Sequence, residues 1–206
     1  MNNSVDITTN IGCRVQCKFC PQDVSMSNYA IKNSFKKIEF GNPVLMLYQT
    51  FVEILKKIPK NVLIRFSGFS EPFLNPECIK MIQYANDNGY QIQLYSTLVG
   101  MTANDVDILN TVKLQKFVIH LADNEKYAKI SLSQHKEILK KIVSFHMENV
   151  FFMTMGTIPD EIKNIIGMDV QASEMVDWAG HIDSGRKTKR ITGPILCTMN
   201  QSKNNR

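Results

Sequence analysis

Segments with the pattern of β-strands alternate with segments that have the pattern of amphipathic helices along most of this 206-residue chain. One example is the β-branched and aromatic run Val62–Ser67, followed by a helical pattern at Pro76–Asn88 that Gly89 closes. Strands that alternate with helices usually pair in parallel through right-handed crossovers. The sequence therefore predicts an α/β fold with a parallel sheet and outer helices.

The other expected elements continue this alternation. Further strands are expected at Val5–Thr9, Gln91–Ser96, Lys116–Leu121 and Val150–Met155, with Val170–Val176 as a candidate for a sixth. Further helices are expected at Leu47–Ile58, Ala103–Thr111, Ser131–Met147 and Asp160–Ile166, and the polar stretch 22–41 is expected to form a flap or a disordered insertion. Propensity does not separate a partial (β/α)6 barrel from a doubly wound sheet. In both folds ligands bind at the carboxyl ends of the strands.

Length and composition favour one globular domain in a reducing compartment. The chain is 44% hydrophobic and 21% charged, and it shows neither a signal-peptide pattern nor an apolar run long enough to span a membrane. We therefore expect a cytoplasmic protein without membrane contact. The net charge is +5, and the densest basic run, Arg186–Arg190, has no interleaved aromatic residues. A solvated linker is the favoured interpretation of that run, so nucleic acid is not the expected partner.

Cys13, Cys17 and Cys20 form a CX3CX2C motif directly after the first expected strand. Three thiolates can hold three irons of a 4Fe–4S cluster, whose usual complement is four cysteines, and no fourth cysteine lies nearby. One iron is then open to a non-protein ligand. Two alternatives are weaker: a zinc site usually has four ligands in two separated pairs, and a redox pair of Cys17 and Cys20 leaves Cys13 unexplained.

The motif, with the aromatic Phe19 directly before its last cysteine, resembles that of the radical S-adenosylmethionine (radical SAM) superfamily. The resemblance implies a partial (β/α)6 TIM-like barrel, a 4Fe–4S cluster on Cys13, Cys17 and Cys20, and S-adenosylmethionine bound to the open iron. It implies an enzyme that reductively cleaves this cofactor to methionine and a 5′-deoxyadenosyl radical for hydrogen abstraction. A reductant such as flavodoxin or ferredoxin is the implied electron donor, and Phe19 is expected to shield the cluster or contact the cofactor.

The segment after the second expected strand contains Gly68, Ser70, Glu71 and Pro72. It resembles the glycine-glutamate segment of the superfamily, in which backbone groups and the acid receive the methionine amino group. Ser70 stands where a second glycine is frequent. Glu71 also has an independent rationale, because a carboxylate accepts a charge-assisted hydrogen bond from an ammonium group. The alternative is an acid that merely precedes a turn.

Two later strand ends carry further candidates. Ser96, Thr97 and Leu98 stand in a segment that resembles the superfamily's polar segment, which usually reads Thr-Asn-Gly, and Leu98 departs from that asparagine. The resemblance implies that Ser96 or Thr97 contacts the methionine carboxylate or the ribose, although a hydroxyl there also suits a helix cap. His120 matches the position of a residue that hydrogen-bonds the ribose, with a structural histidine as the alternative. Met153 is expected in the core or against the adenine.

The segment Asp177–Cys197 resembles the bridge to the cysteine-rich SPASM or twitch-type extension of several radical enzymes. Nine residues without a cysteine follow Cys197, so we expect a truncated extension, an orphan Cys197 and a chain whose completeness as a catalyst is open. The predicted division is a radical SAM core at 1–180 and a basic bridge with a remnant of the extension at 181–206. The bridge favours a peptide, protein or sugar substrate. Methyl or methylthio transfer to RNA, and a non-enzymatic iron–sulfur or zinc-binding module, stay open as alternatives.

Overall fold

The computed structural model describes residues 3–33, 38, 42–68, 70–173, 176–177 and 189–190. One five-stranded sheet has the order β1-β4-β5-β6-β7, and each neighbouring pair is parallel. Its strands are β1 (Ser4–Ile7), β4 (Leu63–Phe66), β5 (Ile92–Ser96), β6 (Leu114–His120) and β7 (Val150–Met153). This sheet confirms the predicted α/β fold class, and all five strand ends where ligands are expected lie at the same edge.

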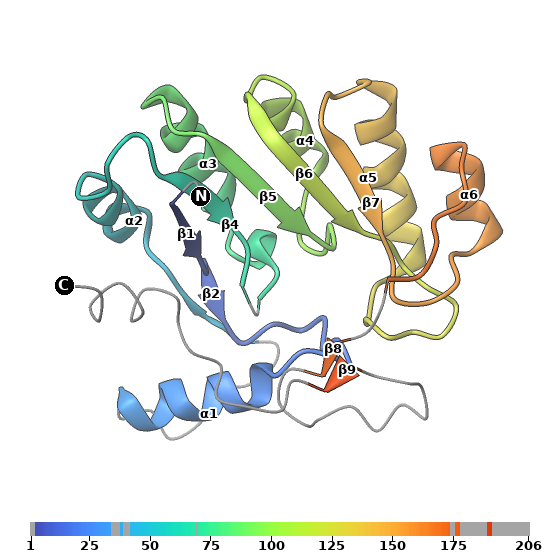
Figure 1. Ribbon diagram of the computed structural model, residues 1–206, viewed down its shortest axis with the longest axis horizontal. Helices are drawn as coiled ribbons and strands as arrows, with labels where there is room; N and C mark the ends of the chain where they lie inside the picture. The colour runs from blue at the N-terminus through green and yellow to red at the C-terminus, as the bar shows by residue number, and fades with distance from the viewer. Residues whose placement is uncertain are drawn as a thin grey trace.

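Helices follow the strands as the sequence predicts. They are α2 (Tyr48–Leu55), α3 (Cys78–Asp87), α4 (Ala103–Leu109), α5 (Leu132–Ser144) and α6 (Asp160–Ile166). A short 3-10 helix, η1 (Pro72–Leu74), was not predicted. Figure 1 shows α3, α4 and α5 behind the sheet, as right-handed crossovers require. The main core lies between these helices and the sheet and includes the fully buried Phe51 and Phe66, whose ring centroids are 5.7 Å apart. Each such side chain contributes about 1.5–3 kcal/mol on burial.

Local signals set the helix ends. The Thr102 hydroxyl accepts a hydrogen bond from Asp105 N, and the Asp105 carboxylate accepts one from Thr102 N, so a capping box starts α4. Gly167 follows α6 with a left-handed φ of 70°, which a glycine adopts without strain. These signals are visible in the sequence, and α6 has the predicted bounds.

The polar stretch predicted as a flap instead contains the helix α1 (Gln22–Lys32). Met26 and Ala30 of this helix pack with Ile38 in a small hydrophobic cluster separate from the main core. Ser and Asn residues lower the helix propensity of this stretch, and tertiary packing overrides that preference. In Figure 1, α1 lies beyond the carboxyl ends of the strands, apart from the sheet.

Two short antiparallel strands, β2 (Asn10–Ile11) and β3 (Val44–Leu45), were not predicted either. Two residues are too few for a strand periodicity to show in a sequence. This pair ties the chain before the cysteine motif to the chain before α2. It therefore fixes where the cysteine loop leaves the sheet.

The candidate sixth strand does not join the sheet. Residues 170–173 form no strand, and β8 (Val176–Asp177) pairs with β9 (Lys189–Arg190) in a separate parallel sheet. Apart from β9, the chain from 178 to 206, with Cys197 and most of the basic bridge, lies outside the described residues. The division near residue 180 therefore stays a prediction. In the part of the chain that is described, no helix has the length and apolar character needed to cross a membrane.

Candidate active site

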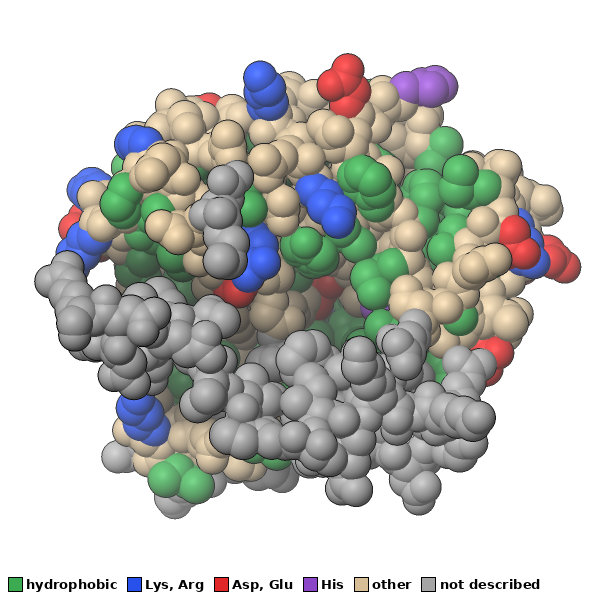
Figure 2. Space-filling view, in the orientation of Figure 1, with side chains coloured by type: hydrophobic (Ala, Val, Ile, Leu, Met, Phe, Trp, Pro, Cys, Tyr) green, Lys and Arg blue, Asp and Glu red, His purple; other side chains and the backbone are tan. Residues whose placement is uncertain are grey.

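A cavity of about 160 Å³ lies at the carboxyl ends of the parallel strands. Its wall includes every residue for which the sequence predicts cluster or cofactor binding: Cys13, Cys17, Phe19, Cys20, Gly68, Ser70, Glu71, Ser96, Thr97 and His120. Met153 completes this wall at the end of β7. Figure 2 shows hydrophobic side chains gathered around a hollow at the centre of the face seen in Figure 1. Segments far apart in the sequence thus meet at one site.

The cysteine loop is anchored on two sides. Lys18 N donates to Tyr127 O at 2.7 Å, and Lys129 N donates to Val15 O at 2.8 Å, so the loop pairs with the segment that follows β6. On the other side, Cys13 N donates to Oε1 of the buried Gln22 at 2.9 Å. Gln22 also lines the cavity and was not predicted as a site residue. Its place two residues after the last cysteine is the signal that could have found it.

The thiols of Cys13 and Cys17 are held in an environment that favours their neutral form. Burial raises the pKa of Cys13. Burial, and then the nearby Cys20, Cys13 and Glu71, raise the pKa of Cys17 well above its usual range. Iron binds the thiolate, so cluster binding must release protons from these side chains.

The donor set suits a cluster better than a single ion. Within the described residues, no three His, Cys, Asp or Glu side chains are placed to hold one metal ion. A zinc ion draws its sulfur ligands to about 2.3 Å. In a 4Fe–4S cluster each cysteine binds a different iron, so the thiols stand farther apart. Three thiols that line one cavity are the number of protein ligands that a 4Fe–4S cluster with one open iron requires.

The cavity of the free protein is smaller than a typical site that encloses a small organic ligand. Its volume of about 160 Å³ is below the roughly 300–1,000 Å³ of sites that enclose a small organic ligand. The cavity is open to the surface, so this volume does not limit the size of a ligand. The donor chemistry fits the implied groups.

Glu71 is 3% exposed, and its carboxylate accepts four hydrogen bonds. Ser96 Oγ and Phe73 N donate to Oε1 at 2.7 and 3.2 Å. Thr97 N and Thr97 Oγ1 donate to Oε2 at 2.5 and 2.6 Å. Burial nevertheless raises the pKa of Glu71. A carboxylate has about four lone-pair positions, so these bonds fill them. Glu71 thereby holds the end of β5 against η1. Binding of an ammonium group by Glu71 stays a prediction.

A set of buried polar contacts joins β2 to the segment around Glu71. Thr9 Oγ1 donates to Pro72 O at 2.9 Å, and Asn10 Nδ2 donates to Glu71 O at 2.8 Å. Ser70 Oγ donates to Asn10 Oδ1, and Asn75 Nδ2 donates to Thr9 O at 2.9 Å. Neither Thr9 nor Asn10 was predicted as a functional residue. They couple the strand that leads into the cysteine loop to the glycine-glutamate segment.

Backbone conformation explains Gly68 and draws attention to Leu98. Gly68 has a φ of 105°, and a Cβ there would lie 2.3 Å from Thr8 Oγ1, so only glycine fits. Leu98 is 1% exposed and has a φ of 63°, in the left-handed region that asparagine tolerates better than leucine. Compared with the asparagine that is usual in the segment it resembles, Leu98 strains the backbone more but buries an apolar side chain.

His120 presents an unsatisfied polar atom at this site. It is 8% exposed and stacks on Phe19, with ring centroids 5.5 Å apart and an interplanar angle of 26°. Burial lowers the pKa of His120 to about 4, so the ring is neutral at pH 7. Its Nε2 has no hydrogen-bond partner among the described residues. Such an atom costs about 1–3 kcal/mol, which a polar ligand recovers.

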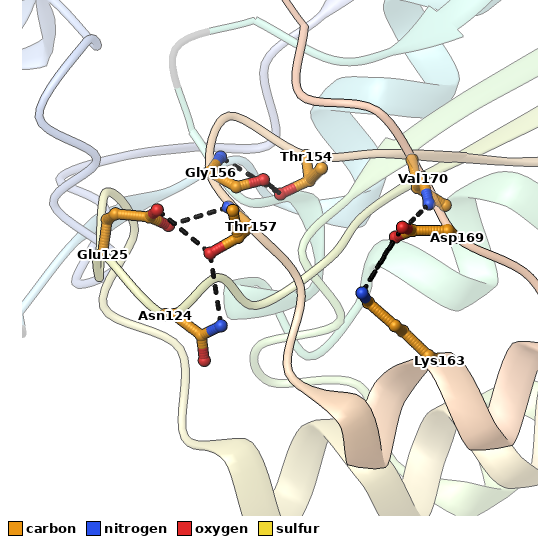
Figure 3. A network of polar contacts seen from close by, with 8 residues as sticks. All are labelled: Asn124, Glu125, Thr154, Gly156, Thr157, Lys163, Asp169 and Val170. Carbon is orange, nitrogen blue, oxygen red and sulfur yellow. Dashed lines mark hydrogen bonds and ion pairs between the residues drawn. The ribbon is translucent and has the colours of Figure 1, made fainter.

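The loops after β6 and β7 are linked by the polar network of Figure 3. Thr157 N and Thr157 Oγ1 donate to the two carboxylate oxygens of Glu125 at 2.8 and 3.0 Å, and Asn124 Nδ2 donates to Thr157 Oγ1 at 3.2 Å. A Cβ on Gly156 would lie 2.1 Å from Glu125 Oε2. A side chain at this position would therefore push the two loops apart. The network holds the β6 and β7 ends of the sheet edge together.

Comparison with known proteins gives a likeness in sequence and a likeness in fold. No protein-family model matches the chain. The chain is 30% identical over 92 residues to the probable dual-specificity RNA methyltransferase RlmN of Staphylococcus saprophyticus, a match that spans 44% of this chain and 23% of that protein.

The fold is similar to the crystal structure of BtrN in complex with AdoMet and 2-DOIA, with a TM-score of 0.51 and 16% identity over 75% of this chain and 57% of that one. A BtrN structure in an open conformation gives a TM-score of 0.45 at 15% identity over 75% and 56% of the two chains. The chain thus covers less than two thirds of each protein that it matches. It shares the α/β fold of BtrN.

Proposed function

We propose that this chain is a radical SAM protein. Cys13, Cys17 and Cys20 hold a 4Fe–4S cluster, and the adjoining cavity receives S-adenosylmethionine. When bound, the cluster supplies the electron that cleaves the cofactor to methionine and a 5′-deoxyadenosyl radical, which abstracts hydrogen from a peptide, protein or sugar substrate. The observation that carries the proposal is the meeting of the three thiols with four other strand ends at one cavity.

The cluster-binding part of the site is a partly buried loop. Cys13 is 4% exposed, and the loop hydrogen-bonds to the segment after β6 and to Gln22. These contacts position the loop through its backbone N–H and C=O groups, so the thiols stay available for iron. The burial of Cys13 limits the access of water to that side of the loop, and water exclusion protects reactive intermediates.

The cofactor-binding part combines an apolar wall with a few fixed polar groups. Phe19, Val118 and Met153 line the cavity beside the neutral ring of His120. This composition is typical of a small-molecule site, in which few polar groups fix the orientation of the ligand. Nε2 of His120 is a fully buried polar atom in this wall that lacks a partner in the described part of the chain, and we assign it to the ribose.

Gly68, Ser70, Glu71, Ser96 and Thr97 form the side of the cavity proposed for the methionine part of the cofactor. The hydroxyls of Ser96 and Thr97 donate to Glu71 in the free protein. An ammonium group that reaches Glu71 must therefore replace or share one of these donors. A hydroxyl can rotate away from the carboxylate and donate elsewhere, so the exchange needs no backbone movement.

The proposed function is tested by incubation of the anaerobically reconstituted, reduced protein with labelled S-adenosylmethionine. Labelled 5′-deoxyadenosine and methionine are the expected products. A protein that carries one zinc ion and no sulfide would instead be a zinc-binding module. A protein that holds a cluster but never cleaves the cofactor would be a non-enzymatic iron–sulfur module.

A second candidate function rests on the sequence likeness to an RNA methyltransferase. In that case S-adenosylmethionine supplies a methyl group for transfer to RNA, and a methylthio product would also require a separate sulfide donor. The assay is transfer of label from the methyl group of the cofactor to RNA. Label in RNA, with methionine and 5′-deoxyadenosine absent from a matched reaction without RNA, would favour this second function over hydrogen abstraction from a peptide, protein or sugar.

A further inference from the structure

A second cavity, of about 290 Å³, lies beside the candidate active site. Its wall is formed by the loop after β5, the segment before α5, the start of α5 and Arg14 of the cysteine loop. Thr97 lines both cavities, and Arg14 directly follows Cys13. The two cavities are therefore neighbours that share part of one wall.

The charge of this second cavity is positive. Arg14 and Lys129 line it, and no Asp or Glu does. Lys129 Nζ donates to the neutral Gln16, and neither cation forms a salt bridge within the described residues. A concave surface lined by one sign of charge attracts a ligand of the opposite sign. Guanidinium and ammonium groups bind phosphate through charge-assisted hydrogen bonds.

The N-terminus of α5 faces the same cavity. Ser131, the N-cap residue, and Gln134, in the first turn, both line it. No side chain caps this end of the 13-residue helix, and its first turn contains no acid. The first N–H groups of a helix lack intrahelical acceptors and carry the positive end of the helix dipole. Such a terminus is a common binding site for phosphate.

His135 gives an independent indication of a ligand. It lines the cavity, is 2% exposed, and its Nδ1 lies 3.2 Å from Thr97 O. A ring that donates its Nδ1–H to this carbonyl presents Nε2 as an acceptor. That Nε2 is buried and without a partner in the described part of the protein. A ligand hydroxyl is the group that would satisfy it.

We propose that this second cavity binds a sugar phosphate. Arg14, Lys129 and the N-terminus of α5 hold the phosphate group, and His135 accepts a hydrogen bond from a sugar hydroxyl. The volume of about 290 Å³ is just below the roughly 300–1,000 Å³ of sites that enclose a drug-sized ligand, and a sugar phosphate is smaller than such a ligand. The idea that the sugar phosphate is part of the substrate rests on the proposed function. The idea that the cavity binds a sugar phosphate does not depend on that function.

The probes are ribose 5-phosphate, which carries a terminal phosphate monoester, and a short RNA oligonucleotide, which carries internal phosphodiesters. Calorimetric titration of the reconstituted protein should give saturable binding of at least one probe. Binding of ribose 5-phosphate alone identifies a free sugar phosphate as the source, and tighter binding of the oligonucleotide identifies a nucleic-acid backbone. Both outcomes support the site.

The matched variants are Arg14→Gln and Lys129→Gln, with Lys140→Gln at an exposed position of α5 as the control. Each site variant should weaken binding by about tenfold or more, because each removes one hydrogen bond to a charged group. Iron content and circular dichroism identify any variant that fails to fold. Absence of saturable binding of both probes, or equal weakening by Lys140→Gln, would overturn the proposal. Formation of 5′-deoxyadenosine is a separate readout, so failure here leaves the proposed function standing.

Discussion

Thr97 donates two hydrogen bonds to the same carboxylate oxygen of Glu71, one from its backbone N–H at 2.5 Å and one from its hydroxyl at 2.6 Å. The other oxygen of Glu71 also faces a backbone N–H, that of Phe73, at 3.2 Å. Each oxygen thus meets a donor that cannot become an acceptor. The site requires a carboxylate here, because an amide in either orientation would place its NH2 group against an N–H.

Glu71→Gln is therefore expected to lower the free energy of unfolding by about 1–3 kcal/mol, the cost of a buried donor left unsatisfied. Urea unfolding of the free protein measures this effect. Glu77→Gln at the start of α3 is the control, because Glu77 accepts from Tyr48 N through a single oxygen. Affinity for S-adenosylmethionine should also fall, by about tenfold. Unchanged stability with lost affinity would show that Glu71 serves the ligand alone.

Gln22 is predicted to position the cysteine loop. Gln22→Leu removes the acceptor of Cys13 N, which lies 2.9 Å from Gln22 Oε1 in a buried contact. The loop should become mobile, so cluster assembly slows and the assembled cluster is lost faster on exposure to a chelator. The exposed Gln83→Leu on α3 is the matched control. Equal rates of cluster loss in both variants would remove Gln22 from the positioning role.

His120→Phe tests whether the unpartnered Nε2 of His120 lowers the stability of the free protein and serves to bind the cofactor. The substitution keeps an aromatic ring beside Phe19 and removes the Nε2 atom that has no partner in the described residues. The free protein should become more stable, by about 1 kcal/mol or more. Cofactor affinity measured by calorimetry should fall at the same time. A destabilised variant with normal affinity would identify His120 as an ordinary core residue.

The burial of His135 predicts a stability that depends on pH. Burial lowers the pKa of His135 to about 4 in the folded protein, against about 6.5 in an unfolded chain. Between these values the unfolded chain binds more protons, so the free energy of unfolding falls as the pH drops from about 6.5 to about 4. The loss reaches about 3 kcal/mol at the low end.

Urea unfolding at about pH 7 and pH 5 measures this dependence in wild type and in His135→Asn. The variant should lose less stability on acidification, although the buried His120 keeps part of the effect. The exposed His146→Asn controls for the loss of a histidine. Identical pH dependence in wild type and His135→Asn would contradict the assignment.

The long elements and the location of the site could be predicted because they depend on periodicity and on topology. Apolar patterns gave strands such as β5 and helices such as α6 close to their bounds, and parallel strands necessarily place their carboxyl ends at one edge. The helix α1 and the strands β2 and β3 escaped prediction, because packing onto a small separate cluster and pairing between two-residue strands leave little periodic signal.

The contacts that hold the site together were also beyond sequence reasoning. Asn10 and Thr9 act through buried hydrogen bonds to backbone atoms of a segment that is distant in the sequence. No spacing rule connects such residues with their partners. The saturation of Glu71 likewise became visible only when Ser96, Thr97 and Phe73 were placed around it.

Iron and sulfide analysis of the anaerobically reconstituted protein tests the central claim most directly. The wild type should hold about four irons and four sulfides per chain. Single replacement of Cys13, Cys17 or Cys20 by Ala should abolish the cluster absorption, whereas Cys78→Ala, which removes a buried thiol on α3, should retain it. Full iron and an unchanged spectrum in all three motif variants, or one zinc ion and no sulfide in the wild type, would contradict the account.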